Sequence, residues 1–261
     1  MTCAAPWDSP DGRSTNDPAL SADALLNGQV RLLQPATGYR AAIDPVFLAA
    51  AVPARAGEGV LDLGCGVGAA GLCLLARVPG ARLTGLDIQR DLVDLARENA
   101  RLNGWSERLT AVCGDVSGPP EALAGHDFHH VMCNPPYVPR AAARPSANRA
   151  KAVANVEGEA DLGCWVSRAL AMARPKGTVT FIHRADRLDG LLAALNRQAG
   201  EITVFPLWPA RGKAAKRVIV RARKGALVPS RLCAGLVLHE ADGRFTPAAE
   251  AVLRGAAAIE F

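Results

Sequence analysis

The sequence predicts an α/β protein with a mostly parallel sheet of about seven strands and helices on both faces. From Glu58 onward, short apolar runs alternate with amphipathic stretches, which is the pattern of βαβ units. The first apolar run leads directly into a glycine-rich turn and then a helix. The chain has 261 residues, 49% hydrophobic and 21% charged, which suffices for one large domain with a substantial core.

The expected elements follow one another in order along the chain. Strands are expected at residues 59–65, 81–88, 108–116, 128–134, 178–184, 201–208 and 217–223. Helices are expected at residues 69–78, 90–104, 161–177 and 187–198. The helix over 90–104 is the clearest, because its apolar residues recur on one face and Gly104 suits a C-cap. Pro175 and Gly177 are expected to end the helix over 161–177.

The flanking regions are expected to be smaller than the main domain over residues 25–224. Residues 1–24 read as a disordered tail, and residues 25–57 have room for a hairpin and a short helix. Residues 225–261 read as an irregular appendage with a small helix that begins at Thr246-Pro247. The N-terminus lacks the pattern of a secretory signal, and no apolar run would cross a bilayer, so a cytoplasmic location is expected.

The cysteines and the net charge limit the kinds of ligand that the sequence predicts. The seven cysteines contain no Cys-x-x-Cys pair, which argues against a disulfide framework and a zinc site, so no metal is expected. The net charge of +5 and the pI of about 9.0 favour a polyanionic partner, although charge alone is a weak signal.

A glycine-rich loop follows the first predicted strand. Gly64, Gly66 and Gly68 allow a tight turn and a close approach of the backbone to a ligand, at the carboxyl end of a strand. Asp87 ends the second strand about 20 residues further on, where an acid can hold ribose hydroxyls. A lone glycine triplet could be a ligand-free turn, but the acid at this distance predicts an adenosine-type cofactor.

The charge pattern distinguishes two cofactors. Residues 66–71 match Gly-x-Gly-x-x-Gly, so a nicotinamide dinucleotide has to be considered. Asp62 lies inside the first strand, where a carboxylate suits a cationic ligand and disfavours a pyrophosphate. S-adenosylmethionine carries an ammonium and a sulfonium and no phosphate. Asp115, after the third strand, is placed to meet an adenine amine, so we expect S-adenosylmethionine.

The fourth predicted strand ends on Asn-Pro-Pro-Tyr at residues 134–137. Two prolines cannot donate to a ladder, so the strand must stop there. The side-chain carbonyl of Asn134 and the backbone carbonyl of Pro135 can accept from a planar amine and stabilise the charge that develops on it. Tyr137 offers a ring on which a base can stack. The alternative is a proline-rich turn with a packed tyrosine.

These motifs, in this order and spacing, resemble the class I S-adenosylmethionine-dependent methyltransferases of the Asn-Pro-Pro-Tyr branch. The segments on which the resemblance rests are "VLDLGCGVGAAGL", "GLDI", "GDV" and "NPPY". The resemblance covers roughly residues 32–223. It implies a Rossmann-like fold, methylation of an amino nitrogen, and catalytic roles for Asn134, Pro135 and Tyr137. The cofactor-binding residues that it implies are Asp62, Gly64, Gly66, Gly68, Asp87, Ile88, Asp115, Val116 and Asn134. It also implies that residues 38–44 close over the cofactor through Tyr39, and packing of Tyr39 on the core is the equal alternative.

Four flanking segments resemble the bacterial family that N6-methylates the adenine 3′ of the anticodon in a valine tRNA. They are residues 30–52, 156–166, 181–188 and 235–255. This resemblance implies a tRNA as the RNA partner and a segment over residues 25–57 that covers cofactor and substrate.

Two runs of basic residues are consistent with such a partner. Residues 211–224 contain seven basic residues and no acid, and residues 140–156 are also basic without an acid. Such runs are usually solvated faces, but the second directly follows Asn-Pro-Pro-Tyr and so borders the expected target base. The candidate substrate-binding residues are Arg140, Arg144, Lys213, Lys216 and Arg217.

Several rival functions remain open at this point. A release-factor glutamine methyltransferase shares Asn-Pro-Pro-Tyr, but it carries a helical substrate domain for which this chain has no room before the glycine loop. An rRNA amino-group methyltransferase is a further alternative. A dehydrogenase-like dinucleotide binder is disfavoured by Asp62, and an RNA-binding module without turnover is disfavoured by the intact motif at residues 134–137.

Overall fold

The computed structural model describes residues 20–37, 40–118, 120–136, 161–196 and 198–261. A 9-stranded sheet forms its centre, in the order β10-β8-β9-β7-β6-β3-β4-β5, with β11 beside β8. Only β9 runs antiparallel to its neighbours in this described sheet, which confirms the predicted mostly parallel architecture. The strands are β3 (Gly59–Leu63), β4 (Arg82–Asp87), β5 (Leu109–Cys113), β6 (Phe128–Cys133), β7 (Ala173–Arg184), β8 (Ala199–Ala210), β9 (Arg217–Lys224), β10 (Arg231–Leu232) and β11 (Leu236–His239).

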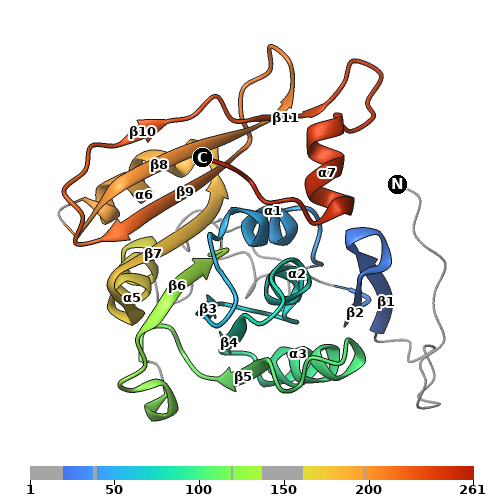
Figure 1. Cartoon of the computed structure of the whole chain (residues 1–261), viewed down its shortest axis with the longest axis vertical. Coiled ribbons are helices and arrows are strands. Elements are labelled where there is room, and N and C mark those ends of the chain that lie inside the picture. Colours follow the sequence, from blue (N-terminus) through green and yellow to red (C-terminus); the bar gives the residue numbers. More distant parts are fainter. Residues whose placement is uncertain (1–19, 38–39, 119, 137–160, 197) are drawn as a thin grey trace.

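Helices cover both faces of the sheet (Figure 1). Along β3 the side chain of Val60 packs into one core, while Leu61 and Leu63 pack into the other, because successive side chains of a strand point to opposite faces. The first core lies under α1 (Asp44–Ala51), α2 (Ala69–Arg77), α3 (Arg90–Leu102) and α7 (Pro247–Gly255). The second lies under α5 (Leu162–Met172) and α6 (Leu188–Leu195).

The boundary between α5 and β7 differs from the predicted one. The helix ends at Met172 rather than near Pro175 and Gly177, and β7 begins at Ala173. Ala173 pairs with Phe128 of β6, and the register shifts before the regular ladder resumes at Thr178. Proline and glycine are tolerated at such an irregular start of a strand. Pro175 and Gly177 therefore lie within β7 and do not end α5.

Both predicted domain boundaries need correction. The described chain begins with β1 (Leu20–Leu25), which pairs antiparallel with β2 (Val30–Pro35), so the hairpin begins before residue 25. At the other end, β10 and β11 pair parallel with β8 and so add two short strands to the main sheet, whereas the small helix α7 begins after Thr246 as predicted. The second change was not visible in the sequence, because it depends on the pairing of β10 and β11 with the distant strand β8.

A buried asparagine attaches the N-terminal hairpin to the sheet domain. Asn99 of α3 is fully buried, and its Oδ1 accepts from the backbone N–H of Leu33 at 2.7 Å. Its Nδ2 donates to the carbonyls of Leu33 at 2.9 Å and Val67 at 3.0 Å. This explains an amide on the otherwise apolar face of α3, because buried polar backbone groups require partners.

We expect Asn99→Ala to lower the free energy of unfolding by about 3 kcal/mol, because three backbone groups then lose their buried partner. Urea denaturation followed by circular dichroism measures this loss. Asn103→Ala is the matched control, since its amide makes similar bonds to the backbone of Arg31 at an exposed position and should cost about 1 kcal/mol. Equal losses in both variants would contradict this role of Asn99.

Candidate functional site

Four neighbouring parallel strands end at the edge of the sheet where the site is expected. The chain passes from β3 outward to β4 and β5, and then returns to β6 on the other side of β3. Open α/β sheets bind ligands at the carboxyl ends of the strands beside such a reversal. Leu63 of β3 pairs with Cys133 of β6, so Gly64 and Asn134 leave the sheet side by side.

The glycine loop adopts the tight turn predicted from the sequence. Gly64, Gly66 and Gly68 have φ angles of +73°, +53° and +84°, in the left-handed region that favours glycine. The backbone N–H of Gly64 donates to the carbonyl of Leu86 at 2.7 Å, and that of Gly66 donates to Asp87 Oδ2 at 2.8 Å. The loop is therefore fastened to the end of β4.

Asp87 organises this edge of the sheet as well as presenting a carboxylate to it. Its Oδ1 accepts from the N–H of Gln89 at 2.9 Å, while its Oδ2 accepts from Gly66. Burial raises the pKa of the Asp87 carboxyl, and the backbone donors counteract that rise. A carboxylate has further lone pairs, which could accept ribose hydroxyls. The next residue, Ile88, is 59% exposed, so an apolar surface lies beside the acid.

Asp62 is a buried acid with an unsatisfied oxygen. Its side chain is 2% exposed, and its Oδ2 has no hydrogen-bond partner among the described residues. Burial, and then the charge of Asp87, raises the pKa of Asp62 to about 7. A buried carboxyl group of this kind fits a cationic ligand, because a nearby positive charge offsets the cost of ionising it. The ammonium and sulfonium of S-adenosylmethionine meet that requirement.

The loop after β5 lies at the same edge of the sheet as the other predicted cofactor-binding residues. The N–H of Gly114 donates to the carbonyl of Asp87 at 2.9 Å, which holds this loop beside the end of β4. Asp115 Oδ1 accepts from the N–H of Ser117 at 2.8 Å, and Val116 is buried. The structure therefore gathers the predicted residues of β3, β4 and β5 at one edge. Their binding roles stay predictions.

The structure describes part of the Asn-Pro-Pro-Tyr motif. Asn134 is partly buried and Pro135 is buried, directly after β6. Tyr137, Tyr39, Arg140 and Arg144 lie outside the described residues.

The basic candidates after β8 differ in their surroundings. Lys213 and Lys216 are exposed between β8 and β9. Arg217 is instead about one-third exposed, and its Nε donates to Asp44 Oδ2 of α1 at 2.9 Å. This ion pair connects α1 to β9, so a contact with RNA is better tested on the two lysines.

Sequence reasoning missed two residues of α5 that contact the loops of the site. Trp165 packs against Gly64, and Arg168 donates to the backbone carbonyls of Val116 and Ser117. Their spacing of three residues places them on one helix face, but no local sequence pattern indicates what that face contacts.

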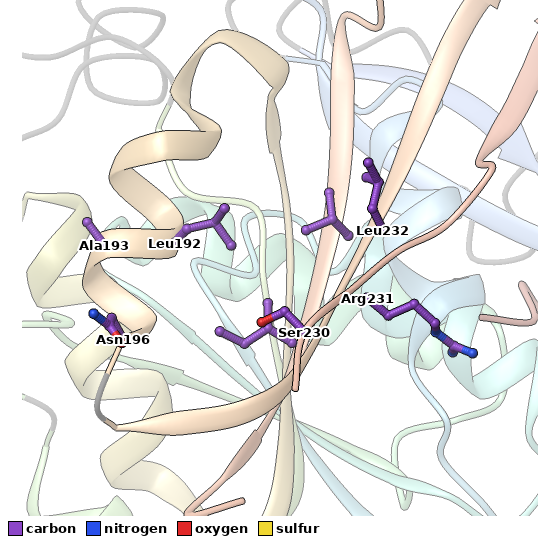
Figure 2. A pocket seen from close by; sticks show the side chains of 8 residues that line it. Leu192, Ala193, Asn196, Ser230, Arg231 and Leu232 are labelled. Atoms are coloured by element: carbon purple, nitrogen blue, oxygen red, sulfur yellow. The ribbon is translucent and has the colours of Figure 1, made fainter. Parts of the chain in front are cut away.

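A cavity of about 530 Å³ lies away from these residues, between α6 and the segment that leads into β10 (Figure 2). It contains none of the predicted site residues, so we do not assign the cofactor to it. Its lining residues are Leu192, Ala193, Asn196, Ile202, Val204, Ser230, Arg231 and Leu232. Within the described ranges, no helix has the length and apolar character needed to cross a membrane.

Comparisons with known proteins indicate the class of this protein. Residues 43–159 match the family described as methyltransferase small domain. The solved structure of a "predicted O-methyltransferase" from Agrobacterium tumefaciens is 28% identical, with a TM-score of 0.70 over 83% of this chain and 98% of that one. The chain is therefore a class I S-adenosylmethionine-dependent methyltransferase, which confirms the predicted class, enzyme type and cofactor.

Two curated relatives indicate which kinds of methyltransferase this chain is similar to. The tRNA1(Val) (adenine(37)-N6)-methyltransferase of Porphyromonas gingivalis is 29% identical over 72% of this chain and 74% of its own length. The release factor glutamine methyltransferase of Chlorobaculum tepidum is 42% identical, but over only 31% of this chain and 28% of its own length. The chain is thus similar to the first relative over most of its length and to the second over a short segment.

Proposed function

We propose that this methyltransferase acts on tRNA and methylates the N6 amine of the adenine 3′ of the anticodon. The observation that carries the proposal is the position of Asn134, which leaves β6 beside the glycine loop and at the reversal in strand order. There it can meet a planar amine next to the cofactor. An anticodon-loop base is already partly unstacked, so its presentation to the site costs little.

The extent of similarity favours tRNA over a release factor. The match to the tRNA1(Val) enzyme includes most of both chains, whereas the matches to two release factor glutamine methyltransferases cover only 31% and 44% of this chain. Between residue 20 and the glycine loop, the described part of this chain forms a hairpin and the short helix α1. The broader match therefore supports the tRNA enzyme.

The proposed chemistry requires acceptors and alignment rather than a strong base. Asn134 Oδ1 and the Pro135 carbonyl would accept from the two hydrogens of the amine, which localises its lone pair and stabilises the charge that grows there. The prolines restrict the backbone, so these acceptors are oriented before the substrate arrives. When bound, S-adenosylmethionine supplies the electrophilic methyl group. Much of the rate enhancement would come from holding the amine in line with it.

A hydroxyl target is the second candidate, because the similar Agrobacterium tumefaciens structure is that of a predicted O-methyltransferase. A hydroxyl has a single hydrogen and needs a base to remove it, so two adjacent acceptors suit an amine better. The proposal therefore specifies nitrogen.

Methyl transfer from radiolabelled cofactor tests the proposal directly. The protein should label unmodified total tRNA, and digestion should release N6-methyladenosine. Ribosomal RNA and a release factor are incubated in parallel. Label in the release factor, in rRNA alone, or on an oxygen atom would overturn the tRNA N6 assignment.

Lys213 and Lys216 provide a separate test of RNA binding. Each phosphate contact on a single-stranded segment contributes a slope of about −0.7 to log K against log salt. We expect the double change Lys213→Gln and Lys216→Gln to weaken tRNA binding and to reduce that slope by up to about 1.4, with cofactor binding unchanged. Fluorescence anisotropy over a series of salt concentrations measures both quantities.

A matched control removes charge from the opposite edge of the sheet. Arg174 and Lys176 are exposed at the amino end of β7, and Arg174→Gln with Lys176→Gln changes the net charge equally. If both double variants lose the same affinity, the effect is one of overall charge and the basic run is a solvated face.

A further inference from the structure

Helix α5 lies against the glycine loop through Trp165. This side chain is only 8% exposed, and a Cβ added to Gly64 would meet its ring at 2.7 Å. The indole therefore packs directly on the loop backbone, at the first glycine after β3. A side chain at position 64 would have to displace the ring, so Trp165 fixes how far this part of the loop can move toward α5.

The same helix fastens the loop after β5 through Arg168. Its Nε donates to the carbonyl of Val116 at 2.8 Å, and its Nη2 donates to the carbonyl of Ser117 at 2.7 Å. A guanidinium presents donors in a rigid planar arrangement, so two successive carbonyls are held in one orientation. The Asp115 side chain also bonds to the N–H of Ser117, which makes residues 115–117 one connected unit.

The first turn of α5 is itself anchored. Asp161 caps the helix, with its Oδ1 accepting from the N–H of Cys164 at 2.8 Å. Buried residues of α5, including Val166 and Ala169, pack into the core under β3 and β6. The helix is therefore a firm support from which one face reaches both loops.

We propose that Arg168 is a positioning residue that sets the conformation of residues 115–117 and thereby the recognition of the adenine of the cofactor. Trp165 supports the neighbouring glycine loop from the same helix face. This role goes beyond the transfer reaction, because it assigns selectivity among cofactor analogues to a side chain outside the cofactor-binding set. It rests on the S-adenosylmethionine site and is independent of which RNA base is methylated.

Selectivity between two analogues tests the proposal. S-adenosylhomocysteine carries the adenine amine, and S-inosylhomocysteine carries a carbonyl in its place. Calorimetry on the parent protein should show preferential binding of the first. Arg168→Met should reduce the ratio of the two affinities about tenfold, the equivalent of one lost hydrogen bond near 1.4 kcal/mol. Arg168→Lys keeps a cation but not the planar pair of donors, so it should give an intermediate ratio.

Arg97→Met is the matched control. Arg97 of α3 also donates through Nε and Nη2, to the carbonyl of Ala111 within β5, away from residues 115–117. It should change thermal stability without changing the affinity ratio. A parental preference that persists in both Arg168 variants, or that Arg97→Met reduces equally, would overturn the positioning role. Failure of the parent to bind either analogue would instead overturn the cofactor site on which the proposal rests.

Discussion

Replacing Asn134 with alanine is expected to lower the rate of methyl transfer by about a hundredfold or more, which is far more than it weakens the binding of tRNA or cofactor. The reason is that the Asn134 carbonyl would interact most strongly with the amine as positive charge develops on it. Loss of one oriented transition-state partner typically has an effect of this size. Single-turnover transfer to unmodified tRNA, at saturating substrate and with cofactor binding verified, is the appropriate measurement.

The structure also offers a control for this experiment. Asn196 lines the cavity beside α6, on a part of the molecule that contains none of the proposed site residues (Figure 2). Asn196→Ala should transfer methyl groups at the parental rate. If a folded Asn134→Ala protein does the same, Asn134 is only a turn residue and the proposed chemistry is wrong.

The sequence predicted the central architecture because each of its signals is local. The alternation of apolar runs and amphipathic stretches identified β3 to β9 and the helices between them, apart from the bounds of α5 and β7. Strands β10 and β11 have two and four residues, too few to show an alternating pattern. They are strands only because β8 offers a free edge, which is a property of the folded sheet.

In the site, too, local features could be predicted from the sequence and distant contacts could not. The glycines and Asp87 could be predicted because a strand, a tight turn and a second strand end lie close together in sequence. The contact of Arg168 with Val116 joins residues 52 positions apart, and the pair of Arg217 with Asp44 joins residues 173 apart. The contact of Arg168 makes α5, which reads as a core helix, a support for the site. The ion pair of Arg217 gives a residue that was predicted to bind RNA a partner within the protein. Periodicity and composition carry no information on such pairs.

We expect ionised Asp62 to lower the stability of the folded protein and to strengthen cofactor binding. Its pKa is raised from 3.8 to about 7 in the folded protein, so between these values the folded state keeps a proton that the unfolded state loses. The free energy of unfolding therefore falls as pH rises through this window, by about 4 kcal/mol in total. Asp62→Asn removes the ionisation and buries an amide, which costs about 1–3 kcal/mol. At pH 8 the variant should thus be more stable than the parent by about 2 kcal/mol.

Cofactor affinity should change in the opposite direction. The cationic cofactor favours ionised Asp62, so parental affinity should fall as pH drops below the pKa of about 7, approaching tenfold per unit. Loss of one partner of a buried charge pair costs about 2–5 kcal/mol, so Asp62→Asn should bind S-adenosylmethionine at least about thirtyfold more weakly at pH 7.5. Its affinity should also be nearly independent of pH between about pH 5.5 and pH 7.5. Calorimetry across this range, with the exposed Asp94→Asn as control, measures both effects. A variant that binds as tightly as the parent, with the same pH dependence, would show that the Asp62 carboxylate is not what holds the positive end of the cofactor.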